Sequence, residues 1–304
     1  KIDKTKSIEK FTNRELVEIL TNYFALLLLK KTFWRLKFKI ENCKFIELDF
    51  IFKGITTIPE AIKYLSSLNT LIFRYNQITS LPDWIGRFTS LENLNLNVND
   101  IKVIPESIGL LSSLKELMLW KNEIRTLPRS IGSLSKLERI NLRLNHIERL
   151  PDSIGKLSSL RELNLHDNKL QYLPETLGSL NSLEELNLSW NELKELPNSI
   201  GNLFALKVLD LERNDLTIIP KEIGTLKSLT ILNLSDNKLA GIPETIGNLS
   251  SLQYIYLSRN RLKFLPESLD SLSQLKEIYL GGNDLNNFFN ILNQLEEKGV
   301  KVHY

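Results

Sequence analysis

The chain has 304 residues, of which 42% are hydrophobic and 25% are charged, a composition typical of folded globular proteins. Its formal net charge of +3 is too small to indicate nucleic-acid binding by itself, and its single cysteine, Cys43, excludes an intrachain disulfide. The longest apolar run, Tyr23 to Leu29, is much shorter than the roughly 20 residues of a membrane-spanning helix, so no transmembrane segment is expected.

Residues 1–44 are predicted to form an N-terminal cap made of a helix and an edge strand. Thr12 and Glu15 have the spacing of a capping box, which predicts a helix from there to about Lys31. Alternating apolar and basic residues over 36–40 favour a strand after it. The apolar stripe with which the helix is expected to face the rest of the protein consists of Leu16, Ile19, Leu20, Tyr23 and Leu27.

This cap is basic, with 11 Lys or Arg and 5 Asp or Glu in residues 1–44. Such a balance suits an acidic partner or a membrane surface, but a solvated capping helix is the commoner explanation. Because the chain begins at Lys1 and not at a methionine, a segment upstream of it is expected.

Residues 45–285 contain an internal repeat of 23 residues, with ten full units and the start of an eleventh. Leucine-like residues recur at one phase, from Phe45 and Leu68 through Leu160 to Leu275. All ten prolines share a second phase, and eight of the thirteen glycines share a third. No proline is left to mark a linker, so residues 1–304 are predicted to form one continuous structural domain.

Each repeat has a physical interpretation. Its L-x-x-L-x-L stretch alternates as a short strand does when one face is buried, and stacking of such units builds one long core. The asparagine that follows, for example Asn168, can bond to backbone groups at the turn. Proline ends further pairing, and the glycine is expected to permit a tight turn. The repeat therefore predicts an α/β solenoid of parallel strands.

The C-terminal end of the chain departs from the repeat pattern, as a capping segment of a repeat array does. Residues 286–304 are predicted to form a C-terminal cap in which a helix over 287–298, with Phe288, Ile291, Leu292 and Leu295, covers the last unit. Gly299 is a helix stop, and residues 300–302 favour a final short strand.

The unit L-x-x-L-x-L-x-x-N, followed by L-P-x-x-I-G-x-L, resembles the leucine-rich repeat family, and the resemblance runs from Phe45 to about Leu285. The 23-residue class is found in intracellular Ras-pathway scaffolds, and it is equally similar to large sets of bacterial proteins, notably from spirochaetes. The resemblance implies a horseshoe with a parallel sheet on its concave face and helical caps at both ends. It also implies binding through that face, without naming a ligand.

The sequence contains no pattern typical of an enzyme. The histidines His146, His166 and His303 lack neighbouring ligands at a metal-binding spacing, and the repeat already accounts for the glycines. No catalytic residue, metal site or cofactor is therefore predicted, and the interpretation is a non-enzymatic protein.

The outward positions of the strands indicate a candidate partner-binding patch on the concave face. Trp, Tyr and Arg are the residues most enriched at interface hot spots, and an apolar row exposed without a partner is unusual. The patch consists of Ile72, Arg74, Tyr75, Val98, Met118, Trp120, Arg143, Leu144, His166 and Trp190. A weaker second cluster consists of Tyr254, Tyr256 and Tyr279. The alternative is that these side chains lie flat and shield the sheet. Trp34 and Trp84 lie off this face and are expected to be packing residues.

Three functions follow as hypotheses. The first is a protein-binding module, with a bacterial secreted or cell-surface protein that contacts host or envelope proteins as the favoured form. The second is an intracellular signalling scaffold, or a fragment of a larger leucine-rich repeat protein. The third is nucleic-acid or membrane binding through the basic cap, although no nucleic acid is expected as the main partner. Self-association through the patch stays open, as does the identity of the protein partner.

Overall fold

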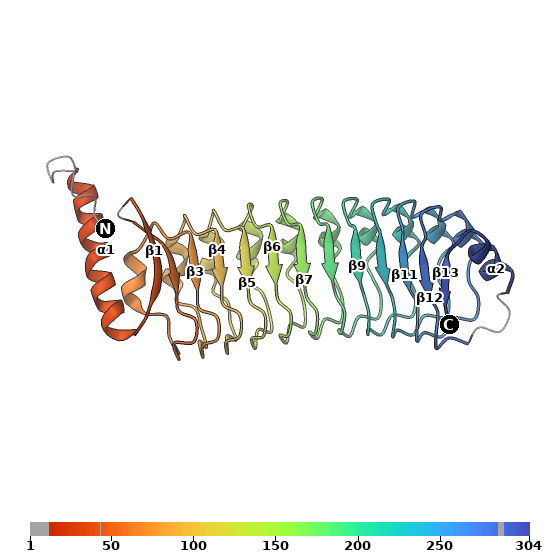
Figure 1. The fold of residues 1–304 in the computed structure, drawn as a ribbon, viewed down its shortest axis with the longest axis horizontal. Coiled ribbons are helices and arrows are strands. Elements are labelled where there is room, and N and C mark those ends of the chain that lie inside the picture. The colour runs from red at the N-terminus through yellow and green to blue at the C-terminus, as the bar shows by residue number, and fades with distance from the viewer. Residues whose placement is uncertain (1–11, 43, 285–288) are drawn as a thin grey trace.

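The computed structural model describes residues 12–42, 44–284 and 289–304. The chain winds into a row of stacked coils, with the strands side by side on one side of the molecule and the 3-10 helices behind them (Figure 1). Helix α1 (Asn13–Thr32) covers the first coil, and helix α2 (Phe289–Glu297) lies at the opposite end. The predicted α/β repeat solenoid with a helix at each end is confirmed.

The strands form one open sheet in chain order. Strand β1 pairs antiparallel with β2, and every later neighbour pairs parallel. The strands are β1 (Lys37–Glu41), β2 (Lys44–Asp49), β3 (Thr70–Ile72), β4 (Asn93–Asn95), β5 (Glu116–Met118), β6 (Arg139–Asn141), β7 (Glu162–Asn164), β8 (Glu185–Asn187), β9 (Val208–Asp210), β10 (Ile231–Asn233), β11 (Tyr254–Tyr256), β12 (Glu277–Tyr279) and β13 (Lys301–His303).

A short 3-10 helix follows the proline of each repeat, and this proline is the N-cap residue of the helix. These helices are η2 (Glu60–Tyr64), η3 (Asp83–Arg87), η4 (Glu106–Leu110), η5 (Arg129–Ser133), η6 (Asp152–Lys156), η7 (Glu175–Ser179), η8 (Asn198–Asn202), η9 (Lys221–Thr225), η10 (Glu244–Asn248) and η11 (Glu267–Ser271). Proline suits this position because its fixed φ is already helical and it has no N–H to leave unpaired.

The core is a column of leucines and isoleucines that runs the length of the array. Leu163 and Leu165 are 1% and 0% exposed, and the equivalent residues of the other coils are buried in the same way. Register explains this regularity, because each strand residue pairs with the residue one repeat away, as Leu163 does with Leu186. A leucine in one coil therefore packs against the equivalent leucines of the two neighbouring coils.

The asparagines bond to backbone groups at the turns as predicted, and because they stack from coil to coil they form a ladder. Asn168 is buried, and its side-chain oxygen accepts from the backbone N–H of Ile147 at 3.0 Å. Its amide nitrogen donates to the carbonyls of Leu142 and Leu165, both at 3.0 Å. Equivalent asparagines do the same in the neighbouring coils, so each one joins two successive turns and pairs buried backbone groups that would otherwise lack partners.

The repeated glycine has a different role from the tight turn expected of it. It lies inside the 3-10 helix, not at a position of positive φ. A Cβ added at Gly86 would lie 2.6 Å from the carbonyl oxygen of Ser107 in the next coil, so glycine is required because successive 3-10 helices pack closely. The first and last units fit this explanation: η2, which carries Lys63 at this position, packs less closely on η3, and η11, which carries Asp270, faces α2.

The residue before each ladder asparagine has left-handed backbone, as in Val98 (φ 57°), Asp167 (φ 56°) and Trp190 (φ 57°). These residues sit at the turn off each strand, where their backbone still pairs with the next coil, as the N–H of Val98 does with the carbonyl of Trp120. Four residues of the predicted patch therefore lie just beyond the carboxyl ends of the strands: Tyr75, Val98, Leu144 and Trp190. A β-branched residue such as Val98 rarely adopts this conformation.

In the N-terminal cap the elements are as predicted but the orientation of the helix is not. The capping box of Thr12 and Glu15 opens α1, and β1 is the extra edge strand. However, the side chains that α1 buries are Asn22, Ala25 and Leu29. The predicted stripe is wrong: Leu16 and Ile19 are half-buried, and Leu20, Tyr23 and Leu27 point to solvent.

The other predictions for the ends have mixed outcomes. Helix α2 buries Ile291, Leu292 and Leu295 as expected, and Gly299, with φ 84°, stops it. Phe288 lies outside the described residues. Trp84 packs partly buried against the core, as predicted, but Trp34 is 77% exposed and is not a packing residue.

Candidate binding face

The sheet face is defined here as the outward surface of β2 to β13 together with the turn residue that follows each strand. The ten residues of the predicted patch all lie on it, over β3 to β8 and their turns. Ile72 and Met118 end their strands, and Arg74, Trp120, Arg143 and His166 stand two residues beyond a strand end. The left-handed turn positions, beyond the carboxyl ends of the strands, are occupied by Tyr75, Val98, Leu144 and Trp190. Within this patch, aromatic contacts form a first group near β3 and a second group near β7 and β8.

The first group is an aromatic stack with a cation on it. The rings of Phe52 and Tyr75 are stacked with centroids 4.5 Å apart. The guanidinium of Arg74 lies 4.7 Å from the Tyr75 ring centroid and donates to its hydroxyl at 3.0 Å. Phe52 remains 71% exposed, so this stack presents a large apolar surface that its neighbours already hold in place.

The second group is centred on Trp190, which is 43% exposed. The Arg213 guanidinium lies 4.0 Å from the ring centroid, and the His166 ring lies beside it at 6.1 Å. The His166 Nδ1 lies 2.7 Å from the Ser189 hydroxyl, which donates to the Asn187 side chain at 2.6 Å. Trp190 is thus an exposed aromatic ring beside His166, whose own ring is placed by its contact with Ser189.

Trp120 differs from Trp190 although both were predicted as members of one patch. It is half-buried, and its indole nitrogen is covered without a hydrogen-bond partner. Its backbone N–H instead donates to the Asn97 side chain at 2.8 Å. Trp120 therefore lies against the sheet, which is the shielding alternative that the sequence left open. Met118, Leu144 and Val98 are likewise half-buried, whereas Arg143 is exposed.

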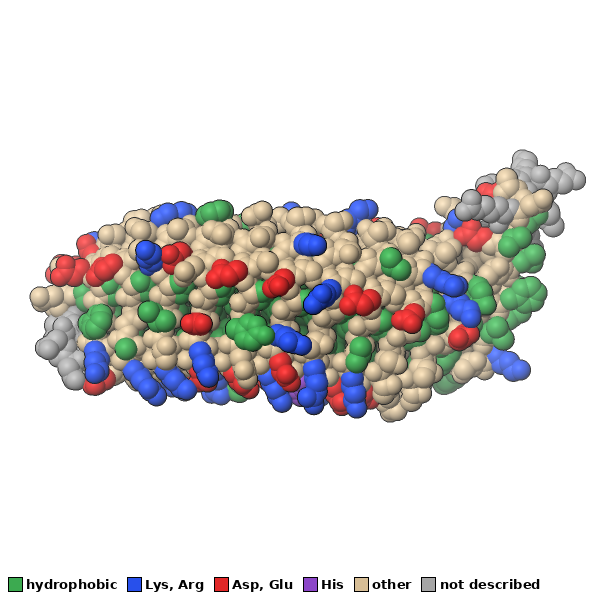
Figure 2. Space-filling view, turned by 180° about the vertical axis from the view of Figure 1, so that it is seen from behind, with side chains coloured by type: hydrophobic (Ala, Val, Ile, Leu, Met, Phe, Trp, Pro, Cys, Tyr) green, Lys and Arg blue, Asp and Glu red, His purple; other side chains and the backbone are tan. Residues whose placement is uncertain are grey.

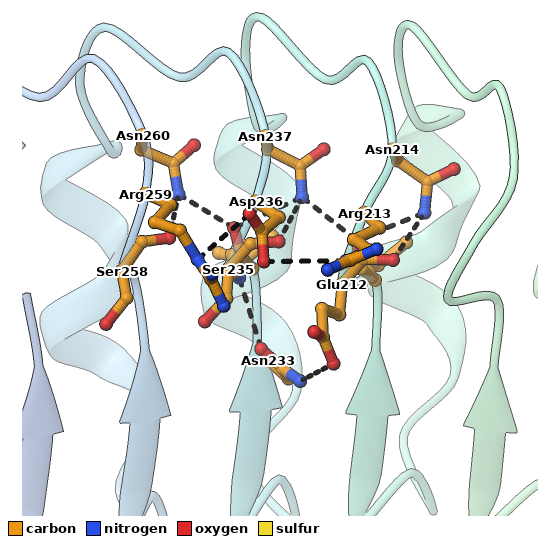
Figure 3. Close-up of polar contacts among 12 residues, drawn as sticks. Glu212, Arg213, Asn214, Asn233, Ser235, Asp236, Asn237, Ser258, Arg259 and Asn260 are labelled. Atoms are coloured by element: carbon orange, nitrogen blue, oxygen red, sulfur yellow. Dashed lines mark hydrogen bonds and ion pairs between the residues drawn. The ribbon is translucent and has the colours of Figure 1, made fainter. Parts of the chain in front are cut away.

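In the coils that follow Trp190, the left-handed turn residues of the sheet face carry alternating charges (Figure 3). Asp236 lies between two arginines of neighbouring coils, 3.8 Å from the Nε of Arg213 and 3.0 Å from the Nε of Arg259. Arg213 thus contacts the Trp190 ring on one side and a carboxylate on the other. These contacts restrain Arg213 in the position where it stacks, although each exposed ion pair contributes little stability.

Near Trp190, Asp210 and His166 have shifted pKa values. Burial raises the pKa of Asp210 above its ordinary value, and the backbone N–H of Glu212, which donates to the carboxylate at 3.0 Å, opposes this only in part. Burial, followed by the positive charge of Arg143, lowers the pKa of His166, so its ring is neutral at pH 7. The region around Trp190 therefore carries a neutral imidazole and a partly buried carboxyl.

The second predicted cluster is part of a stack that continues onto the C-terminal cap. The Tyr256 and Tyr279 ring centroids are 4.6 Å apart, and the Tyr279 and His303 centroids are 4.1 Å apart. The Tyr279 hydroxyl donates to Glu277 at 2.6 Å, and this bond raises the pKa of Tyr279 to about 12. Tyr254 stands beside this stack with Lys276 over its ring. All three tyrosines are half-buried, so the stack covers the end of the sheet.

Sequence reasoning missed Phe52, Arg213 and Ser189 as members of these groups. A usable signal was present, because residues 23 positions apart become neighbours on the sheet face. Phe52 stands one repeat before Tyr75, and Arg213 one repeat after Trp190. Over the described part of the chain, no three His, Cys, Asp or Glu side chains gather as they would around a metal ion. In the same residues, no helix is long and apolar enough to cross a membrane.

Comparison with known families assigns the fold to a class. The model of the leucine-rich repeat region matches residues 85–199 and 196–298, and the chain belongs to the leucine-rich repeat family. Proteins of this family are typically non-enzymatic and bind other proteins through the repeat array. Comparison with curated protein sequences gives no significant match.

Solved structures show the same architecture. A leucine-rich repeat protein of Leptospira interrogans is similar with a TM-score of 0.77 and 38% identity, over 84% of this chain and 64% of that one. The plant peptide hormone receptor RGFR1, solved in complex with RGF2, is 32% identical with a TM-score of 0.68, over 75% of this chain and 38% of the receptor. The functional domain of InlJ from Listeria monocytogenes, 24% identical with a TM-score of 0.70 over 84% of this chain and 53% of that one, shares the fold. The chain thus spans less than two thirds of the length of each of these structures.

Proposed function

We propose that this protein is a non-enzymatic binding module whose sheet face takes a protein partner around Trp190. The observation that carries the proposal is the Trp190 ring, which is 43% exposed and is held between Arg213 and His166. An exposed tryptophan fixed in this way loses little conformational entropy when a partner covers it.

The stack of Phe52, Arg74 and Tyr75 serves as a second anchor on the same face. It lies near β3, five strands before the strand β8 that precedes Trp190. At about 4.8 Å between neighbouring strands, the two anchors are roughly 24 Å apart. A globular protein or an extended chain laid along the sheet face reaches both, whereas a small molecule does not. A peptide hormone bound to a leucine-rich repeat receptor supports this kind of occupant.

For the cellular setting we propose a bacterial secreted or cell-surface protein that contacts host or envelope proteins. Similarity to the Leptospira protein supports this choice over an intracellular scaffold or a fragment of a larger signalling protein. The sequence of the whole gene separates the two, because a signal peptide upstream of Lys1 favours the first and its absence favours the second.

The test compares two double variants in a cross-linking pull-down. Trp190→Ala with Arg213→Ala removes the proposed anchor, and Phe204→Ala with Ile218→Ala removes two exposed apolar side chains outside the sheet face, 59% and 64% exposed. We expect the partners bound by the unmodified protein to be retained by the second variant and lost by the first. An unchanged set of partners in the first variant contradicts the proposal. Sedimentation velocity at several concentrations shows whether one of the partners is a second copy.

A further inference from the structure

Helix α1 presents to solvent a face that is entirely apolar over three turns. In Figure 2 hydrophobic side chains gather at the end of the molecule that carries α1, with Lys and Arg side chains beside them. The members of this outer face are Val17 (63% exposed), Leu20 (54%), Tyr23 (55%), Phe24 (61%), Leu27 (47%) and Leu28 (59%). Soluble proteins rarely leave so many large apolar residues exposed side by side without a function.

The outer face is not the side by which the helix caps the array. Asn22, Ala25 and Leu29 are buried against the first coil and lie on the opposite side of α1. Glu18 also faces the protein, where it accepts from the Ser67 hydroxyl at 2.8 Å and pairs with Lys44 at 3.1 Å. Glu15 is held in the capping box. Among the described side chains of α1, no carboxylate points out with the apolar residues.

Basic and aromatic residues border the outer face at the C-terminal end of α1. Lys30 and Lys31 stand in its last turn, both exposed, and Lys30 lies 5.0 Å over the Phe38 ring. Trp34 follows at 77% exposure with the Arg35 guanidinium 4.3 Å over its ring. The exposed Lys37 on the edge strand β1 adds a further cation. This is an apolar surface bordered by cations, with a tryptophan at the border.

We propose that the outer face of α1 binds the surface of an anionic phospholipid bilayer, with the helix lying in the interface. The apolar residues enter the boundary between headgroups and acyl chains, Trp34 occupies the headgroup level, and the lysines and Arg35 meet lipid phosphates. The sheet face then remains free for its partner, because it is formed by the coils beyond α1 (Figure 1).

Charge favours a bilayer over a second copy of this chain. Residues 1–44 hold 11 basic and 5 acidic residues, so two copies joined through α1 bring like charges together. The helix carboxylates do not offset this, because Glu15 is engaged in the capping box and Glu18 is engaged on the protein side. Anionic headgroups supply the missing counter-charges, and the bilayer covers the apolar residues in the same step.

The test is flotation with lipid vesicles of two compositions: phosphatidylcholine alone, and phosphatidylcholine with about 30% phosphatidylserine. We expect the full chain to float with the anionic vesicles and to be released when salt rises from about 0.1 M to about 0.5 M, because screening weakens the lysine contacts. Phe24→Ser with Leu28→Ser should abolish flotation. Lys30→Gln with Lys31→Gln should weaken it on the order of 25-fold, at roughly five-fold for each lysine.

The matched control is Phe204→Ser with Ile218→Ser, which removes the same kind of exposed apolar side chains outside the cap and should float like the unmodified protein. Far-UV circular dichroism confirms that each variant is folded. The proposal is overturned if the unmodified protein stays unbound, or if the control loses flotation together with the α1 variant. It is also overturned if sedimentation velocity shows a dimer that Phe24→Ser with Leu28→Ser dissociates, because a second copy then covers this face.

Discussion

The repeat array and the N-terminal helix bury their leucines by different rules. In the array each coil has neighbours of its own kind on both sides, so Leu165 and its equivalents are at most 1% exposed. Helix α1 faces a repeat on one side only, and it buries Leu29 while leaving Leu28 59% exposed. Periodicity thus determines burial where a unit packs on copies of itself. At the end of an array, burial depends on the surface that the first coil offers.

The largest effect should come from the leucine column. Leu165→Ala leaves a cavity between coils that cannot close, because the neighbouring coils fix its walls, and it should cost about 2–5 kcal/mol of unfolding free energy. Leu110→Ala is the control inside the array, at a leucine that is 63% exposed, and should change stability by less than about 0.5 kcal/mol. Urea unfolding followed by circular dichroism measures both. Equal losses of unfolding free energy in the two variants would show that burial does not determine how much each leucine stabilises the array.

The second-largest loss of unfolding free energy is expected when an asparagine of the ladder is replaced. Asn168→Ala removes the acceptor for the Ile147 N–H and the donor for the Leu142 and Leu165 carbonyls. Buried backbone groups left unpaired cost about 1–3 kcal/mol each, and water entering the site recovers part of this, so a net loss of about 2–3 kcal/mol is expected. The exposed Asn181 provides the control, since Asn181→Ala should be nearly neutral. A neutral Asn168→Ala would show that the ladder does not stabilise the array.

Close packing of the 3-10 helices gives the next effect. In Gly155→Ala the new Cβ would overlap the carbonyl oxygen of Thr176, and coils held on both sides cannot separate freely. A loss of about 1–3 kcal/mol is expected in the same urea measurement. At Gly241 the added Cβ would meet only the ring of Phe264, 3.1 Å away and 60% exposed, which can move aside. Gly241→Ala should therefore be tolerated, and a similar loss at both positions would contradict the packing explanation.

These two regions also show which features could be predicted from the sequence. The strands, the ladder and the positions of the patch follow from a fixed phase, because equivalent residues such as Asn145 and Asn168 have equivalent neighbours. Three features did not follow. The glycine phase was visible, but its cause is a contact with the next coil. The buried side of α1 is set by one non-repeating surface. Trp120 and Trp190 are both tryptophans on the sheet face, yet Trp120 is half-buried and Trp190 is 43% exposed.

One substitution on the sheet face, Asp210→Asn, is expected to raise the free energy of unfolding, by a smaller amount than the losses above. Burial raises the pKa of Asp210, so the folded state holds the proton more tightly than the unfolded state, and the ionised carboxylate destabilises the fold at neutral pH. Asp210→Asn keeps an acceptor for the Glu212 N–H and places there the asparagine found at this position in β10. It should stabilise the protein at pH 7, because the cost of the buried charge is then removed.

The pH dependence distinguishes this explanation from a general benefit of asparagine. The advantage of Asp210→Asn should shrink as pH falls through the raised pKa and disappear below the ordinary value of 3.8, where the carboxyl is protonated in both states. Thermal unfolding of both proteins between pH 3 and pH 8, in steps of about one unit, measures it. An advantage independent of pH would refute the burial argument.

The smallest effect is expected for Leu28→Ser, which is compared with a substitution of the adjacent, buried Leu29 of α1. Leu29→Ser places a hydroxyl in the contact with the first coil and leaves a cavity, for an expected loss of about 2–4 kcal/mol. Leu28→Ser changes a side chain that touches mainly solvent, so unfolding free energy should change by less than about 0.5 kcal/mol. If Leu28→Ser destabilised the protein as much as Leu29→Ser does, the outer face of α1 would be packed in solution. The apolar residues of α1 would then serve the cap alone, and no bilayer would be needed to explain them.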